Sequence, residues 1–159
     1  MTVVSVDPGL RSLGFVEWDA ESGLTDWGHT AVCPGKITGA SAAAGFSTWL
    51  TSHRERLERA LYIVVENQFP ASFETALCYS QMMTLMVLYG RKVKIVYAKD
   101  VKKHFELPDN RRDKKARAVE LLLEDWLPFF DSFDGTERIH DIADAWLNCK
   151  YFVESNQKA

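Results

Sequence analysis

The sequence predicts a single α/β domain, residues 1–159, built on one mixed β-sheet. Apolar stretches of strand length and longer stretches of helical periodicity follow one another in the order βββαβαβααα. Short connections join the first three strands, as in an antiparallel meander, whereas the fourth strand is continuously apolar, as in a buried parallel strand. The hydrophobic content of 47% is enough for a folded core.

The first half of the chain is expected to hold the meander, one helix and the central strand. Strands are predicted over residues 2–6, 13–18 and 24–32, because Pro8-Gly9 ends the first and turn-forming residues at 21–23 separate the other two. A loop opens at Cys33-Pro34-Gly35, and a helix is predicted over residues 40–59. The apolar run at residues 61–66 is the central parallel strand.

The second half is expected to be mainly helical. We predict helices over residues 72–89, 99–105, 113–126 and 137–154, and one short strand over residues 93–97. The helix at 72–89 is apolar on nearly every side. It is therefore either a fully buried core helix, or a helix with one face on the sheet and another against a second subunit.

Composition limits the cellular setting. No apolar stretch approaches the ~18 residues that a membrane span requires, and the N-terminus lacks a signal-peptide pattern. We therefore expect a soluble, intracellular and cytoplasmic protein, with a viral origin left open. Cys33, Cys78 and Cys149 are widely spaced, without a CxxC pair, so they are expected to be buried free thiols.

Charge is unevenly distributed along the chain. The overall formal charge is −3, but the segment from Arg91 to Arg117 has eleven basic and four acidic residues. Such asymmetry suits a local phosphate-binding surface in an otherwise acidic protein. The alternative is an ordinary solvated helical surface.

Two acidic residues stand at the ends of predicted strands. Asp7 follows the first strand and Glu66 closes the central one. A carboxylate at the end of a buried strand is costly unless it is paired or holds a cation. Glu66 is the clearer case, because Asp7 could also be a turn residue before Pro8.

Two more acidic residues, Asp141 and Asp144, lie three apart in the last predicted helix. This spacing places them on one side of the helix, at the margin of an apolar stripe. The stripe comprises Ile139, Ile142, Trp146, Cys149 and Val153. Surface acids with this spacing are common, but four convergent carboxylates match two-metal phosphodiester hydrolysis, and hard oxygen ligands favour Mg²⁺ or Mn²⁺. His140 is either an accessory ligand or proton relay, or an exposed histidine.

Three motifs carry a resemblance to a known family. Ser5-Val6-Asp7-Pro8-Gly9-Leu10-Arg11, Val65-Glu66-Asn67-Gln68-Phe69 and Asp141-Ile142-Ala143-Asp144-Ala145 resemble, in order and separation, motifs of the RuvC-like Holliday junction resolvases. Glu66-Asn67-Gln68 and Arg112-Asp113-Lys114-Lys115 look most similar to the poxvirus and fungal mitochondrial branch.

The resemblance implies a fold, an activity and a set of site residues. The fold would be ribonuclease H-like, with a five-stranded mixed sheet of order 3-2-1-4-5 flanked by helices. The activity would be that of a homodimeric, metal-dependent endodeoxyribonuclease making paired symmetric nicks in four-way DNA junctions. Asp7, Glu66, Asp141 and Asp144 would be the ligands of two Mg²⁺ or Mn²⁺ ions.

The remaining site residues would contact DNA. Lys102 and Lys115 would reach the scissile region, with Lys115 also catalytic, and Arg112 and Lys114 would bind DNA nearby. A helical-wheel projection of residues 113–126 places Lys115 in line with Val119 and Leu122 on the inward side. Lys115 is therefore preferred as the residue near the scissile phosphate, and Lys114 is expected to point aside. Phe69 matches an aromatic position that stacks on bases in the bacterial enzymes of this family. Phe73, one helical turn later, is an alternative candidate for the same role, and either side chain could instead belong to the core.

Two other functions remain compatible with the sequence. A related nuclease of the same fold could act on RNA, RNA–DNA hybrids or flaps, because the metal chemistry is shared. A non-catalytic junction-binding protein is the third reading, although all four acidic residues are present.

Overall fold

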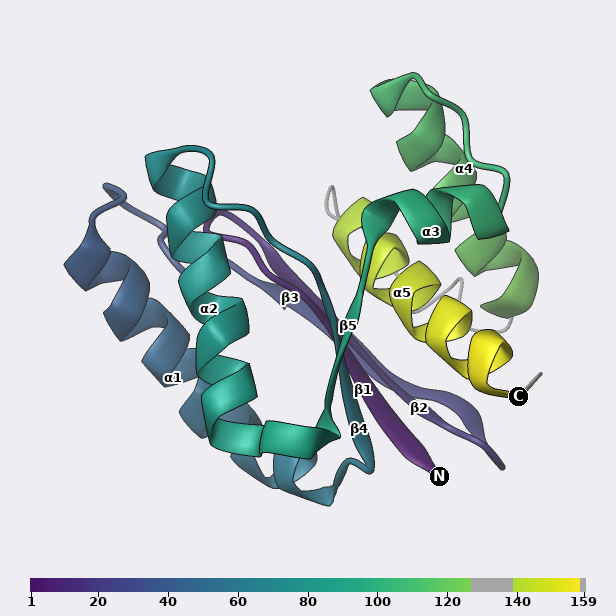
Figure 1. Cartoon of the computed structure of the whole chain (residues 1–159), viewed down its shortest axis with the longest axis horizontal. Coiled ribbons are helices and arrows are strands. Elements are labelled where there is room, and N and C mark those ends of the chain that lie inside the picture. The colour runs from purple at the N-terminus through teal and green to yellow at the C-terminus, as the bar shows by residue number, and fades with distance from the viewer. Residues whose placement is uncertain (127–138, 158–159) are drawn as a thin grey trace.

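A five-stranded sheet lies between two layers of helices in the computed structural model, which describes residues 1–126 and 139–157 (Figure 1). The strand order β3-β2-β1-β4-β5 confirms the expected 3-2-1-4-5. The strands are β1 (Thr2–Asp7), β2 (Leu13–Asp19), β3 (Gly23–Thr30), β4 (Tyr62–Glu66) and β5 (Val93–Val96). The helices are α1 (Gly39–Arg59), α2 (Phe73–Tyr89), the 3₁₀ turn η1 (Gly90–Lys92), α3 (Ala98–His104), α4 (Arg111–Trp126) and α5 (Ile139–Gln157).

The predicted elements are all present, and their ends differ for identifiable reasons. The third strand stops at Thr30 instead of residue 32, because Thr30 pairs with Leu13, the first residue of β2, and no strand lies beside residues 31–32. Helix α4 begins two residues earlier than predicted, since the Asn110 side chain accepts hydrogen bonds from the backbone N–H of Arg112 and Asp113. The predicted start of the last helix at residue 137 lies outside the described residues.

The sheet is mixed. β1 pairs antiparallel with β2 and parallel with β4, β2 pairs antiparallel with β3, and β4 pairs parallel with β5. β1 and β4 therefore run side by side at the centre and end at the same edge.

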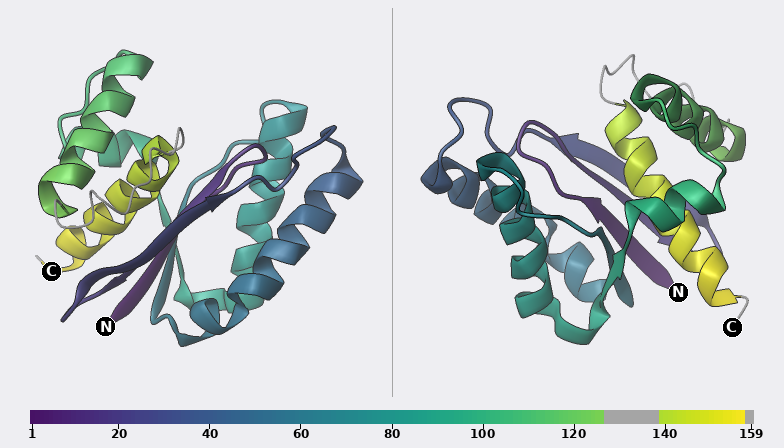
Figure 2. Two further views of the ribbon diagram at one scale, coloured as in Figure 1. Left: turned by 180° about the vertical axis from the view of Figure 1, so that it is seen from behind. Right: turned by 45° about the horizontal axis from the view of Figure 1, so that its top comes forward.

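Each face of the sheet has its own hydrophobic core. Helices α1 and α2 cover one face, and α3, α4 and α5 cover the other (Figure 2). Val4, Val6 and Ile63 belong to the core under α1 and α2, whereas Val3 and Val64 belong to the core under α5. Successive side chains of a strand alternate between faces, so this assignment also decides where the strand-end carboxylates point.

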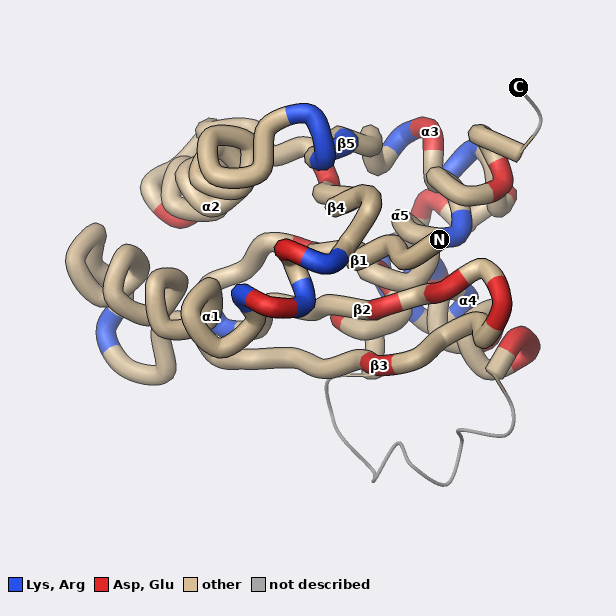
Figure 3. Tube along the Cα trace, turned by 90° about the horizontal axis from the view of Figure 1, so that it is seen from below, with Lys and Arg blue, Asp and Glu red and all other residues tan. Residues whose placement is uncertain are grey.

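Charge is also segregated in the fold. Seen from below (Figure 3), acidic residues gather along the β2–β3 hairpin and basic residues at the turn that leads into β5.

No helix within residues 1–126 and 139–157 is long and apolar enough to cross a membrane.

Helix α2 is buried on one side only, which decides against one of the two predictions made for it. Gln81, Met82 and Leu85 are buried against the rest of the fold. On its other side the helix exposes apolar side chains, namely Phe73, Met83, Met86, Val87 and Leu88. A fully buried core helix is therefore wrong, and one face is left open to solvent.

The cysteines within the described residues are all free thiols, as predicted. Cys33 and Cys149 are buried and Cys78 is partly buried.

Candidate active site

Asp7 and Glu66 lie next to each other at the ends of the two central strands. Val6 pairs with Val65 in the parallel ladder, so the residue after each stands at the same sheet edge. Asp7 is two residues beyond Ser5 and four beyond Val3, and Glu66 is two beyond Val64. By alternation, both carboxylates point to the face that α5 covers.

Helix α5 brings Asp141 and Asp144 to the same place. Its buried side includes Ile142, Ala145 and Trp146, and Asp141 and Asp144 flank this side, as the wheel predicted. The approach is close at Gly14 of β2, the ladder partner of Asp7, because a Cβ there would lie 2.3 Å from the Asp141 carbonyl oxygen. The missing side chain of Gly14 allows the helix backbone to rest on the strand.

The carboxylates influence one another strongly. Burial raises the pKa of Asp7 well above the ordinary value of 3.8. The charges of Glu66, Asp144 and Asp141 raise this pKa further, in that order of size, and Lys114 lowers it. The turn-residue interpretation of Asp7 is thus insufficient, since its carboxylate is electrostatically coupled to the other three.

Burial also raises the pKa of Asp144 and of Glu66. Burial raises the pKa of Asp144 to about 6, and the charge of Glu66 is the next contribution. Burial likewise raises the pKa of Glu66, but a hydrogen bond from Asn148 Nδ2 to Glu66 Oε2 (3.3 Å) opposes this rise. A cation bound beside these carboxylates would favour their ionised forms.

The protein supplies little of that compensation. Lys114 lowers the pKa of Asp7, Glu66 and Asp144, whereas Lys115 acts on Asp144 and more weakly than Lys114. Lys114 also lines a small cavity together with Glu66 and Asp144.

The predicted orientation of the two lysines is therefore wrong for Lys114. The wheel identified the inward side of α4 by Val119 and Leu122, but the fully buried positions are Ala118 and Leu122. Lys114 is one helical turn before Ala118 and lies on that buried side. Both lysines are half-buried, and Lys114 is the one that lies by the carboxylates.

The chemistry of the donors fits a hard divalent cation. Four carboxylates lie at this edge of the sheet. Burial raises the pKa of Cys149 and raises that of Cys78 to about 11, so neither thiol readily becomes a soft thiolate ligand. As they stand, no three His, Cys, Asp or Glu side chains among residues 1–126 and 139–157 form a group that could hold a metal ion.

His140 borders the site. Its Nε2 lies 3.3 Å from Asp141 Oδ1, and the ring is only about one quarter exposed, with a side-chain exposure of 25%. The ring is partly buried, which excludes the alternative of an exposed helix histidine.

The predicted aromatic contacts are solvent-accessible. Phe69, in the loop between β4 and α2, is 69% exposed, and Phe73, at the start of α2, is 61% exposed. Neither is a core residue, so the alternative reading as core is wrong. Both follow Glu66 closely in the chain, at the sheet edge where the carboxylates gather.

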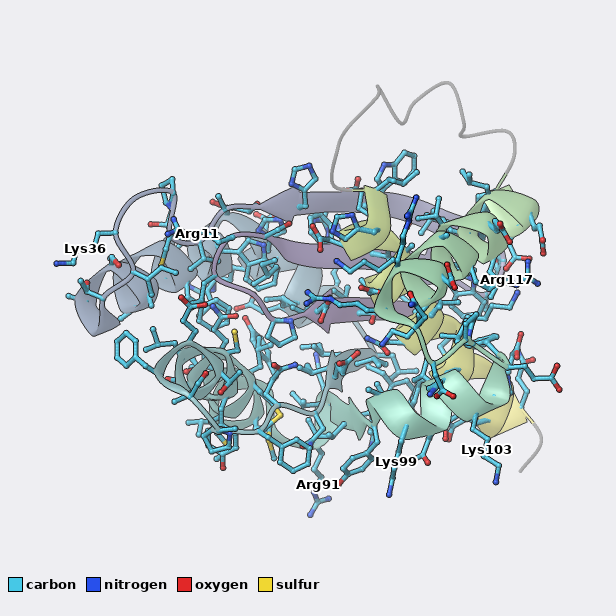
Figure 4. The ribbon with its side chains drawn as sticks, turned by 90° about the horizontal axis from the view of Figure 1, so that it is seen from above. Arg11, Lys36, Arg91, Lys99, Lys103 and Arg117 are labelled. Carbon is cyan, nitrogen blue, oxygen red and sulfur yellow. The ribbon has the colours of Figure 1, made fainter. Side chains whose placement is uncertain are left out.

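The basic segment 91–117 is spread over several elements. Lys99, Lys103 and Arg117 point outward along the periphery, and Arg11 and Lys36 lie at the opposite end of the same view (Figure 4). Lys102 pairs with Asp109, and Arg112 is exposed at the start of α4. The segment thus borders the carboxylates through Lys114 and Lys115, whereas Lys99, Lys103 and Arg117 point outward.

Asn148 is a site residue that the sequence interpretation missed. It is 1% exposed and follows Asp144 by four residues and Asp141 by seven, so it lies on their side of α5. A helical wheel that includes amide side chains as well as acidic ones places Asn148 beside Asp141 and Asp144, so the sequence did carry a signal for it.

The sheet order and the acidic residues on β1, β4 and the facing helix define a ribonuclease H-like fold with a carboxylate cluster at the sheet edge. Comparison with solved structures bears out this class. RuvC of Thermus thermophilus matches with a TM-score of 0.64 and 16% identity over 98% of this chain and 97% of that chain. The fowlpox virus Holliday junction resolvase matches with a TM-score of 0.63 and 16% identity, over 98% of this chain and 99% of that chain.

Two further matches are complexes with DNA. They are T. thermophilus RuvC with a Holliday junction substrate (TM-score 0.62, 13% identity, 98% and 96% coverage) and the fowlpox virus resolvase with substrate Holliday junction DNA (TM-score 0.61, 13% identity, 97% and 98% coverage). The sequence itself matches no family model and no curated protein. The chain therefore has the fold of these resolvases over nearly its whole length, and bacterial and viral proteins match it equally well.

Proposed function

We propose that this protein is a Holliday junction resolvase, a metal-dependent endodeoxyribonuclease that makes paired symmetric nicks in four-way DNA junctions. The observation that carries the proposal is the convergence of Asp7, Glu66 and Asp144 in a fold shared with junction resolvases: burial raises the pKa of all three, and the charge of Glu66 raises the pKa of Asp7 and Asp144 further. Carboxylates with raised pKa values cluster at functional sites, and metal binding is a chemistry that such a cluster can serve.

Asp7, Glu66, Asp141 and Asp144 would hold two Mg²⁺ or Mn²⁺ ions. Ions bound there would supply Lewis-acid stabilisation of the scissile phosphate and of the leaving oxygen. Asn148 would hold Glu66 in place through its hydrogen bond of 3.3 Å. Lys114 and Lys115 would neutralise the phosphate and so favour its approach to an acidic site.

DNA would be held beside the carboxylates by aromatic and basic side chains. Phe69 and Phe73 are exposed enough to stack on unpaired bases near the crossover. Lys102 and Arg112 are placed on α3 and at the start of α4, where they would contact the phosphate backbone.

Paired nicks require two active sites, and α2 offers a surface for a second copy of the chain. Met83, Met86 and Val87 form an exposed apolar face on this helix, with Val87 78% exposed. Contiguous apolar surface of this kind is typical of protein interfaces. We therefore propose a homodimer that packs through α2.

The test uses a synthetic mobile four-way junction, end-labelled in turn on each strand, with Mg²⁺ or Mn²⁺. We expect symmetric nicks across the junction from the wild type and none from Asp7→Asn. Glu55→Gln is the matched control, because Glu55 is exposed on α1, which covers the other face of the sheet.

Two outcomes would contradict the proposal. Equal cutting of a linear RNA–DNA hybrid or a flap would favour the general nuclease of the same fold. Junction binding without metal-dependent cutting would favour the non-catalytic reading.

A further inference from the structure

Three polar side chains are buried among the described residues, and two of them are amides that reach the strand ends of the site. The buried polar residues are Ser5, Gln81 and Asn148. Asn148 bonds Glu66 directly from α5. Gln81 lies on the other side of the sheet, in α2, and it contacts the chain just after Asp7. Burying an amide costs free energy unless its hydrogen bonds are made, so both contacts stabilise the folded state.

Gln81 binds both backbone groups of a single residue. The Gly9 N–H donates to Gln81 Oε1 at 3.1 Å, and Gln81 Nε2 donates to the Gly9 carbonyl oxygen at 3.1 Å. A backbone N–H only donates and a carbonyl only accepts, so the orientation of the amide is determined by Gly9. Pro8 has no N–H, which makes Gly9 the first backbone donor after Asp7.

The remainder of this turn is anchored elsewhere. The Cys33 N–H donates to the Leu10 carbonyl oxygen at 2.8 Å, and Arg11 Nη1 donates to the carbonyl oxygens of Cys33 (2.8 Å) and Gly35 (2.6 Å). These bonds tie the far end of the turn to the loop after β3. Gln81 is thus the anchor nearest to Asp7, and the contact comes from α2.

The turn itself is tightly closed. A Cβ on Gly9 would lie 2.0 Å from the Ser12 carbonyl oxygen, which leaves room for glycine alone. A tightly folded turn moves as a unit, so a shift of its Gly9 end also shifts the end of β1.

We infer that Gln81 is a positioning residue, which holds the turn after Asp7 and thereby couples the placement of α2 to the placement of the Asp7 carboxylate. Gln81 and Met82 face inward on α2, whereas Met83, Met86 and Val87 form its exposed apolar face. A contact that moves or rigidifies α2 is transmitted to the site through the Gln81 amide. The inference rests on the proposed nuclease function, because it assigns Gln81 to the same site.

The experiment compares three variants of the full chain. Gln81→Met keeps the shape of the side chain and loses both hydrogen bonds. Gln81→Glu keeps the acceptor for the Gly9 N–H. Met82→Ala is the matched control, since Met82 is also buried on α2 but takes no part in the recorded bonds to the turn.

Three quantities are measured for each variant. Amide hydrogen exchange at Gly9, relative to Val6 in β1, reports on the turn without any need for activity. Titration with Mn²⁺ alone reports metal affinity. Junction cleavage separates kcat from KM.

For Gln81→Met we expect at least about tenfold faster relative exchange at Gly9 and about tenfold weaker Mn²⁺ binding, as is usual for groups that support metal ligands. We also expect a lower kcat with KM for the junction unchanged. Gln81→Glu should recover protection of the Gly9 amide, and Met82→Ala should leave relative exchange and Mn²⁺ affinity as in the wild type.

Unchanged Gly9 exchange in Gln81→Met would overturn the inference, as would an equal loss of Mn²⁺ affinity in Met82→Ala, which would indicate general packing. If the wild type neither bound Mn²⁺ nor cut junctions, the proposed nuclease function would fail, and with it the role of Gln81 in the site. The Gly9 exchange would then still decide whether Gln81 holds the turn.

Discussion

Replacement of Asp144 by asparagine is expected to stabilise the metal-free protein. The pKa of Asp144 is raised from the ordinary value of 3.8 to about 6, first by burial and then by the charge of Glu66. A shift of about two units corresponds to about 3 kcal/mol of unfolding free energy. Ionised Asp144 therefore costs about this much in the folded state, and Asp144→Asn removes the cost.

The sign of the effect depends on pH. Well below pH 4, Asp144 is protonated in both the folded and the unfolded state, so the wild type has its full stability there. As the pH rises from about 4 to about 6, the unfolded state releases the proton more readily, and the wild type loses stability relative to Asp144→Asn. The advantage of the variant should be near zero at pH 4 and complete above pH 7.

Urea denaturation in EDTA, between pH 4 and pH 8, measures this difference directly. Asp109→Asn is the matched control: Lys102 lowers the pKa of exposed Asp109, so loss of this charge should bring no stabilisation at neutral pH. With Mn²⁺ at a hundred times its Kd the wild type should regain about 2.7 kcal/mol, and Asp144→Asn less. The reasoning would be refuted if Asp144→Asn were no more stable than the wild type at pH 7 to 8 in EDTA, or if its advantage persisted at pH 4.

Three other substitutions examine separate parts of the site and its surroundings. Lys114→Met should raise the pKa of the neighbouring carboxyl groups and move the acid limb of the cleavage pH profile upward, more than Lys115→Met does; equal shifts would contradict the structure. Asn148→Leu removes the donor to Glu66 and should weaken Mn²⁺ binding about tenfold by calorimetry, and an unchanged affinity would remove Asn148 from the site. Val87→Asp should shift the sedimentation of the protein from dimer to monomer while Mn²⁺ binding persists; an unaltered dimer would place the interface elsewhere.

The strand-end acids could be predicted because strands have a simple period. Asp7 and Glu66 each follow an apolar run in which alternate side chains are buried, and two parallel neighbours end at one edge. Asp141 and Asp144 could be predicted from a helical wheel for a similar reason. Their meeting with Asp7, however, depends on Gly14, whose role in the approach of α5 is a contact between distant segments.

The lysines show where pattern reasoning fails. A helical wheel gives the relative angles of side chains within α4. Tertiary packing sets the rotation of the whole helix against α5 and the sheet, and it buries Ala118 and Leu122. Gln81 shows the same limit, because its hydrogen-bonding partner Gly9 lies 72 residues away in the sequence. Gln81 is the one amide side chain in helix α2, but the sequence does not show which backbone groups it binds.

The close contact between α5 and Gly14 has a consequence for when the carboxylate cluster forms. Asp7 belongs to the first strand and Asp144 to the last described helix, so the carboxylate cluster is assembled only when these distant segments meet. Contacts so far apart in sequence form late in folding, because the entropy of closing a long loop must be lost first. A partly folded chain in which these segments have not met therefore holds individual acids but no assembled site. Binding of Mn²⁺ would accordingly serve as a signal that folding is complete.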